Sequence, residues 1–271
     1  MNPFCLKNLL IVLLALLLTG STAWAVIYEP LPEMPYPADN PPSPEKEKLG
    51  SSLFFDPKLS GNNKISCSSC HAPNLGWTDQ KPTSIGFENK KIGRNSPTIL
   101  DSGFNQSQFW DGRSKTLEEQ ALKPIQSPVE MSLSLPDLVK KLSADPKYPA
   151  LFKKAFGDNT ITANRVAQAI ATFERTLKTK ETYYDRYWQG DKSAISPSAI
   201  RGMELFFGKA KCSICHNGPK FTDNQFHNIG IESTSLEEND VGRKKVTMEN
   251  FHLRAFKTPG LRYISLTAPY M

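Results

Sequence analysis

Two short clusters of cysteine and histidine constrain what this chain can fold into more than any other feature. The sequence reads SCSSCH at residues 66–71 and CSICH at residues 212–216, so the pattern Cys-x-x-Cys-His occurs twice. Four of the five cysteines lie in these clusters: Cys67, Cys70, Cys212 and Cys215. The fifth, Cys5, lies in the N-terminal apolar segment, so no cysteine remains for an ordinary disulfide.

The clusters predict two covalently bound c-type haems. Two cysteine sulfurs separated by two residues can reach the two vinyl groups of one porphyrin, and the adjacent histidine then lies below the ring and ligates the iron. His71 and His216 are therefore the expected proximal iron ligands. A zinc site would need cysteine pairs closer together in the sequence. A thioredoxin-like redox pair would need a βαβ setting, which the sequence does not indicate.

The first 25 residues are typical of a secretion signal. Lys7 supplies the positive start, residues 9–18 are almost all apolar, and Ala23-Trp24-Ala25 has the form of a cleavage site. The apolar run is short for a membrane span, although an uncleaved anchor remains the alternative. We expect cleavage after about Ala25, export to the periplasm and no stable membrane span afterwards.

An internal repeat divides the rest of the chain. Residues 50–55 (GSSLFF) precede the first cluster and residues 202–207 (GMELFF) precede the second, which argues for two copies of one unit. Residues 26–45 are rich in proline and lack an apolar period, so they predict an extended arm. We expect one domain over 46–190 and another over 191–271, with the boundary inside 180–195.

The remaining periodic segments are helical. Val166, Ile170, Phe173 and Leu177 share one face of a helix that begins after Thr162 as its N-cap. Residues 135–142 predict another helix, and Ser196 with Pro197 predicts the start of a third. Strand patterns are scarce. The predicted fold class is all-α: two cytochrome c-like helical domains, rich in loops, each built around a covalent haem.

Charge gives little support to nucleic-acid binding. The chain has 33 Lys and Arg against 27 Asp and Glu, and the basic residues are scattered rather than gathered in a block.

Four stretches resemble the bacterial di-haem cytochrome c peroxidases and their MauG-type relatives, in that family's order and spacing. They are LGSSLFFDPKLSGNNKISCSSCH, GRNSPTILDSGFNQSQFWDGR, TLEEQALKPIQSPVEM and FKTPGLRYISLTAPYM. Together they run from Leu49 to the last residue, so the resemblance covers nearly all of the expected mature chain.

The resemblance implies a catalytic pocket on the first haem. Glu130 matches the family's distal glutamate, which moves a proton between the oxygens of hydrogen peroxide. Gln120 and Pro124 match residues on the same haem face, where Gln120 would orient peroxide or water and Pro124 would restrict the cavity. Without the resemblance, Glu130 would be interpreted as a solvated surface charge. Gln120 and Pro124 would be interpreted as a helix surface residue or a helix stop.

The resemblance also implies an electron relay and a calcium site. Trp110 matches the indole between the two haems, with a buried core tryptophan as the alternative. Asn95 and the backbone near Thr258 match the calcium position between the domains, and oxygen ligands of this kind suit Ca²⁺. A turn asparagine before Ser-Pro is the alternative for Asn95.

One residue departs from the peroxidase pattern. Where relatives often carry a histidine after Ser-Ile-Gly that blocks the first iron, this chain has Phe87, which cannot ligate iron. The first iron is therefore expected to have an open face at rest, as in MauG-type enzymes. The alternative is that Phe87 packs in a core and another side chain closes the site.

The second iron's other ligand is not evident. Relatives supply it, as Met or Tyr, from a segment that would follow Met271, so we expect the sequence to be a fragment. Within the sequence the candidates are Met203, Met248, Met271, His227 and His252, and none is favoured.

The predicted function is reduction of hydrogen peroxide to water at the first haem. Electrons would arrive through the second haem from a small cytochrome c or a cupredoxin. The alternatives are MauG-type oxidation of residues in a protein substrate and a non-catalytic di-haem electron carrier. The family also contains homodimers, so a homodimer is a further expectation.

Overall fold

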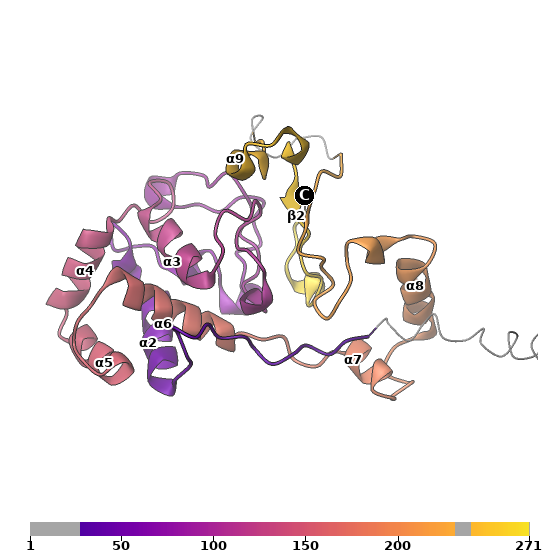
Figure 1. Ribbon diagram of the computed structural model, residues 1–271, viewed down its shortest axis with the longest axis horizontal. Helices are drawn as coiled ribbons and strands as arrows, with labels where there is room; N and C mark the ends of the chain where they lie inside the picture. The colour runs from indigo at the N-terminus through magenta and orange to yellow at the C-terminus, as the bar shows by residue number, and fades with distance from the viewer. Residues whose placement is uncertain (1–27, 231–239, 271) are drawn as a thin grey trace, which may run out of the picture.

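The computed structural model describes residues 28–230 and 240–270, and these form helices joined by long loops (Figure 1). The α-helices are α2 (Pro44–Phe54), α3 (Leu117–Gln126), α4 (Leu135–Ala144), α5 (Lys147–Phe156), α6 (Ala163–Thr176), α7 (Tyr183–Trp188), α8 (Pro197–Phe207) and α9 (Lys244–Thr247). The 3-10 helices are η1 (Pro57–Leu59), η2 (Cys67–Ser69), η3 (Pro73–Leu75), η4 (Phe87–Asn89), η5 (Ser102–Phe104), η6 (Cys212–Ile214), η7 (Asn250–His252) and η8 (Ile264–Leu266). Strands β1 (Phe226–His227) and β2 (Phe256–Lys257) pair antiparallel.

The mostly helical fold expected from the sequence is confirmed, and so are the three helix starts. The Thr162 hydroxyl accepts from the Arg165 amide at the start of α6, and the Ser196 hydroxyl accepts from the Ala199 amide at the start of α8. Ser134 caps α4 in the same way. Each hydroxyl satisfies an amide that has no partner within the helix. Because each cap is formed by residues close together in the sequence, the start of each of these helices can be predicted from the sequence.

The hydrophobic core lies among α2 to α6, which we call the first unit together with their loops (residues 44–176). Figure 1 shows α2 and α6 side by side, with α3, α4 and α5 around them. The largest side chains buried there are Tyr148, Phe54, Phe152, Leu49, Leu53, Leu59, Ile125, Leu138, Leu142 and Ile170. Two of these, Leu53 and Phe54, belong to the repeated GxxLFF segment, so the first copy of that segment is part of a protein core.

Gly50 allows the closest approach between α2 and α6. A Cβ added at Gly50 would lie 1.9 Å from the Ala169 carbonyl oxygen. We expect Gly50→Ala to lower the free energy of unfolding by about 1–3 kcal/mol, because the helices must separate to admit the methyl group. The matched control is Gly202→Ala in α8, where an added Cβ meets nothing within 4 Å. Alanine should stabilise that helix by about 1 kcal/mol. Urea unfolding of both variants measures the difference, and equal effects would contradict this packing.

The second unit (residues 197–270, described over 197–230 and 240–270) is built differently. Among its described residues only Ala255 is a buried hydrophobic residue. No residue of α8 is buried, and Leu205, Ile214 and Phe251 are 53%, 67% and 75% exposed. Apolar side chains exposed in this way mark a surface that something besides the described residues covers.

An extended arm runs beside the first unit and reaches α7 (Figure 1). Residues 28–43 contain no helix or strand, and α2 begins at Pro44, one residue before the predicted end of the arm at 45. At the start of the described arm, the Tyr28 ring stacks on Trp188 with ring centroids 6.2 Å apart. Helix α7 lies inside the 180–195 stretch that was predicted to hold the domain boundary.

The two ends of the chain fall outside the described residues. The predicted secretion signal with its cleavage site at Ala25, and Met271 as a candidate ligand, therefore have no structural description. Within residues 28–230 and 240–270, none of the helices has the length and apolar character that crossing a membrane requires.

Candidate haem centres

The first Cys-x-x-Cys-His cluster forms a tight turn that orients its histidine. Cys67 begins η2, and the His71 amide donates to the Cys67 carbonyl oxygen at 3.0 Å. The Nδ1 atom of His71 lies 3.2 Å from the Trp77 carbonyl oxygen. Because a carbonyl only accepts, Nδ1 carries the proton in this bond, which leaves the lone pair of Nε2 available to a metal.

The second cluster has the same local geometry. The His216 amide donates to the Cys212 carbonyl oxygen at 2.9 Å, and Nδ1 of His216 lies 2.9 Å from the Phe221 carbonyl oxygen. The repeat seen in the sequence is therefore also a repeat of backbone structure. Phe206, from the second GxxLFF segment, lies near this histidine, with ring centroids 6.5 Å apart.

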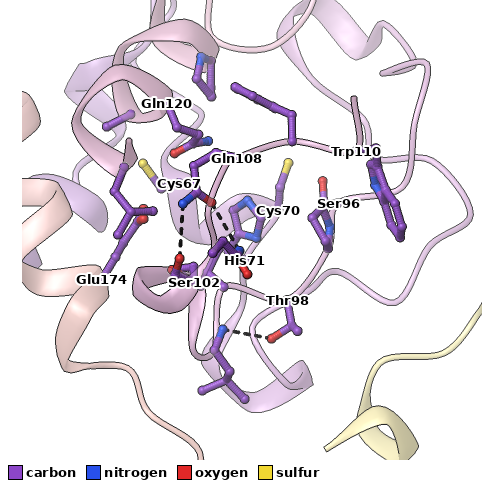
Figure 2. Close-up of a pocket in the computed structure, with 18 of the residues that line it drawn as sticks. Cys67, Cys70, His71, Ser96, Thr98, Ser102, Gln108, Trp110, Gln120 and Glu174 are labelled. Atoms are coloured by element: carbon purple, nitrogen blue, oxygen red, sulfur yellow. Dashed lines mark hydrogen bonds between the residues drawn. The ribbon is translucent and has the colours of Figure 1, made fainter. Parts of the chain in front are cut away.

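A cavity in the first unit brings together the first cluster and most of the predicted site residues (Figure 2). Its lining includes Cys67, Cys70, His71, Asn95, Trp110, Gln120, Pro124, Glu130 and Thr258. Cys212, Cys215 and His216 belong to the second unit and do not line it. In Figure 2 the two sulfurs and the His71 ring face the same space.

The side chains around this cavity fit a covalently bound haem. Burial raises the pKa of the Cys67 thiol and lowers the pKa of His71, so the imidazole is held in the neutral form that metal binding requires. Both thiols are free to form thioethers. Apolar side chains such as Ile99, Leu117 and Ile170 supply walls against which a porphyrin can pack.

Helix α3 and the turn after it supply the Gln120, Pro124 and Glu130 wall. Thr116 caps the helix, and Pro124 lies within its last turn. Because proline has no N–H, the helical hydrogen bond to the Gln120 carbonyl, four residues earlier, is missing. The chain then turns back, since the Met131 amide donates to the Pro124 carbonyl at 3.2 Å, and this turn carries Glu130 to the cavity.

Glu130 lies in an environment that makes its carboxylate more basic than usual. Burial raises its pKa, and the charge of Arg113 and a hydrogen bond from Ser127 offset part of that rise. A half-buried carboxyl with a raised pKa beside a cavity is suited to accepting and returning a proton.

Trp110 lies where the two units meet. Its indole Nε1 donates to the Asn95 carbonyl oxygen at 2.9 Å, and its own carbonyl oxygen accepts from the Lys257 amide of β2 at 2.8 Å. An ion-pair network lies beside it: Arg94 Nε bonds Asp240 at 2.6 Å and Arg94 Nη1 bonds Asp111 at 2.8 Å. The indole is thus fixed at the junction of the units and also lines the first cavity.

Asn95 and Thr258, the predicted calcium residues, both line the cavity at this junction. The Asn95 side-chain nitrogen donates to the Lys81 carbonyl oxygen at 2.7 Å. The side-chain oxygen of Asn95 therefore points away from Lys81. The Thr258 carbonyl oxygen accepts from the Thr222 hydroxyl at 2.6 Å. Each residue keeps oxygen lone pairs of the kind that Ca²⁺ binds.

Phe87 does not line the cavity. Its amide donates to the Val129 carbonyl at 3.0 Å, and its ring lies close to Gly61, so it packs behind the turn that carries Glu130. His71 is the only histidine among the described residues that line the cavity.

The candidates for the second iron's other ligand have other contacts. His227 Nε2 lies 2.7 Å from an Asp223 carboxylate oxygen, and His252 Nδ1 lies 2.9 Å from the Thr247 hydroxyl. Met248 is 80% exposed. None of these contacts favours one candidate.

A sequence model described as "Di-haem cytochrome c peroxidase" matches residues 44–193, more than half of the chain. The chain belongs to the di-haem cytochrome c peroxidase family. The methylamine utilization protein MauG of Methylorubrum extorquens is 44% identical over 244 residues, which cover 88% of this chain and 67% of that protein. The cytochrome c551 peroxidase of Nitrosomonas europaea is 40% identical over 88% of this chain and 72% of that protein.

Solved structures of this family share the fold. A MauG-like protein associated with microbial copper homeostasis superposes with a TM-score of 0.83, at 33% identity over 93% of this chain and 78% of its own. The di-haem peroxidase BthA from Burkholderia thailandensis has a TM-score of 0.75 at 22% identity, covering 90% of this chain and 71% of its own, which supports the fold alone. The resemblance stated from the sequence is confirmed, and family membership implies haem as the cofactor.

Some residues of the cavity were not predicted from the sequence. Glu174 and several cationic residues, including Lys220 and Lys257, line it together with the expected side chains. Glu174 is 5% exposed, and burial raises its pKa to about 8. The sequence around Glu174 (FERT, residues 173–176) does not indicate that this glutamate is buried. Only the packing of α6 against the cavity shows which face of the helix Glu174 occupies.

Proposed function

We propose that this protein reduces hydrogen peroxide to water, with electrons from a small cytochrome c or a cupredoxin. One observation carries the proposal: Gln120 and Glu130 share a cavity with His71, and no second histidine lines it among the described residues. A metal held by His71 would then have room for peroxide on a face that also carries a proton-accepting carboxylate. Named peroxidases among the relatives support this choice.

The predicted site residues of the cavity have separate roles in the proposed reaction. The haem iron, when bound, supplies the redox centre at which the O–O bond is broken. Glu130 accepts a proton from one peroxide oxygen and returns it to the departing oxygen, so that water leaves. The Gln120 amide hydrogen-bonds the peroxide, and Pro124 limits the space around it. Trp110, at the junction of the units, lies on the path of electrons from the second unit.

The remaining parts of the proposal concern attachment, calcium and location. Cys67 and Cys70 would hold one haem through thioethers, and Cys212 and Cys215 a second, with His71 and His216 as iron ligands. Asn95 and Thr258 would contribute oxygens to a calcium site beside Trp110. The apolar segment before Ala25 would export the chain to the periplasm, where c-type cytochromes and copper proteins can act as donors.

The test uses the haem-loaded protein. We expect a high-spin ferric signal before any reduction, and peroxide-dependent oxidation of a ferrous cytochrome c. A protein with two low-spin haems at rest that consumes no peroxide would be an electron carrier, and the proposal would be wrong.

MauG-type oxidation of a protein substrate is the second candidate, favoured by Phe87 lying away from the cavity and by the MauG relatives. Peroxide-dependent modification of a partner protein, without turnover of any cytochrome c or cupredoxin donor, would favour it over the peroxidase.

A further inference from the structure

Five cationic side chains line the cavity of the first unit: Arg94, Arg113, Lys220, Lys257 and Arg262. Each of the three arginines is paired with a carboxylate. Arg94 bonds Asp240 and Asp111, Arg113 bonds Asp111, and Arg262 bonds Asp185 through both terminal nitrogens. These positive charges are therefore already balanced within the protein.

The two lysines differ, because within the described residues no carboxylate forms an ion pair with either. Lys220 Nζ donates to the Asp101 carbonyl oxygen at 2.9 Å and to the Asn105 amide oxygen at 2.5 Å. Lys257 Nζ donates to the Ser107 carbonyl oxygen at 2.5 Å. All three acceptors are neutral.

This arrangement is unfavourable for the protein alone. Lys220 is only 8% exposed, and burial lowers its pKa to about 8. Lys257 is half-buried in β2, where its ammonium has only the Ser107 carbonyl oxygen as a hydrogen-bond partner among the described residues. The Asp101 carboxylate, the acid whose charge acts on Lys220, instead accepts from the Thr179 amide and hydroxyl at 2.9 and 2.6 Å. A buried ammonium is stable when an anion lies beside it.

Both lysines belong to the second unit but reach the first. Lys220 follows the second haem-binding cluster and contacts residues of the first unit 119 and 115 positions earlier in the sequence. Lys257 lies in β2 and contacts a residue 150 positions earlier. The second unit therefore contributes two unbalanced cations to the wall of the first unit's cavity.

Haem carries two carboxylates, its propionates, which match this pair in number and sign. We propose that Lys220 and Lys257 bind the propionates of the first haem, so that the first haem site is completed by the second unit. This inference rests on the proposed haem in the first cavity but not on peroxide reduction. The first haem also holds the two units together, because its charges meet cations from the other unit.

The test is the midpoint potential of each haem in Lys220→Met, Lys257→Met and the double variant, followed by optical redox titration. Removing a positive charge near the iron favours the more positive oxidised state. We expect the potential of the first haem to fall in each single variant and to fall further in the double variant. Lys154→Met, in α5 and exposed, is the control and should leave both potentials unchanged.

Charge-conserving variants keep the test decisive if a methionine variant does not load haem. Lys220→Arg and Lys257→Arg retain the cation and should keep the first haem's potential within the spread of the control. A haem-loaded Met variant with the wild-type potential, or an Arg variant whose potential departs from the control's range, would overturn the assignment. The experiment measures a midpoint potential and not peroxidase activity. A protein that does not reduce peroxide can therefore still confirm that Lys220 and Lys257 bind the propionates.

Discussion

Replacing Glu130 with glutamine is expected to lower kcat/KM for hydrogen peroxide by about 10²–10⁴-fold, the usual contribution of general acid–base catalysis. Glutamine keeps the size and polarity of the side chain but cannot accept a proton. Haem content and the ferric spectrum should stay close to wild type, since Glu130 is on the wall formed by the turn after α3 and not in the Cys67–His71 turn. Steady-state kinetics with a ferrous cytochrome c measures the loss.

The matched control is Glu88→Gln. Glu88 lies in η4, next to the segment that contacts the Glu130 turn, but it is exposed and pairs with Lys90. Its replacement should leave kcat/KM unchanged. Equal kinetics for Glu130→Gln and Glu88→Gln would remove Glu130 from the mechanism.

The pH profile gives a second check on Glu130. A base must be ionised to accept a proton, so activity should fall as pH drops through the pKa of Glu130. Because burial raises that pKa, the fall should begin at a higher pH than for an exposed glutamate. In Glu130→Gln this acidic limb should disappear from the profile of kcat/KM. A limb that persists unchanged would belong to another group.

Local signals in the sequence predicted much of the fold. Thr162 and Ser196 cap helices through their own hydroxyls, and the Cys-x-x-Cys-His turn closes over five residues, so neighbouring residues determine each of these features. The resemblance to a family then predicted that Gln120 and Glu130 face the first cluster. The cavity brings them together, while their roles remain proposals.

The features that were not predicted depend on contacts between distant parts of the chain. Lys220 and Lys257 look like scattered surface cations in the sequence, yet they reach a cavity formed by residues more than 100 positions earlier. The burial of Glu174 depends likewise on how α6 packs. For Phe87 the sequence predicted only part of the result. A phenylalanine cannot ligate iron, but its position behind the Glu130 turn follows only from the fold.

The two units also differ in a way that their shared sequence repeat does not indicate. Leu53 and Phe54 of the first GxxLFF segment are fully buried in a protein core, whereas Leu205 of the second is 53% exposed. Leu53 thus packs in a protein core in one copy, whereas its counterpart Leu205 lies largely exposed in the other. Haem should therefore contribute more to the stability of the second unit than to that of the first.

The double variant Cys212→Ser/Cys215→Ser is expected to lose the second haem and, with it, the folded second unit. Burying each large apolar side chain on a porphyrin is worth roughly 1.5–3 kcal/mol, and the described second unit has no buried hydrophobic residue except Ala255 with which to replace that gain. Limited proteolysis should degrade the second unit and leave a fragment of the first. Peroxide-dependent oxidation of the donor protein should fall to background.

The opposite variant, Cys67→Ser/Cys70→Ser, separates this expectation from a general effect of losing haem. The first unit keeps Leu53, Phe54, Leu138 and Phe152 in a core closed by protein alone, so its helices should survive without haem. Circular dichroism and protease resistance of the two variants give the comparison. If both units lose or keep their structure equally, haem contributes alike to the two cores, and the exposed side chains of α8 must be covered by something other than the porphyrin.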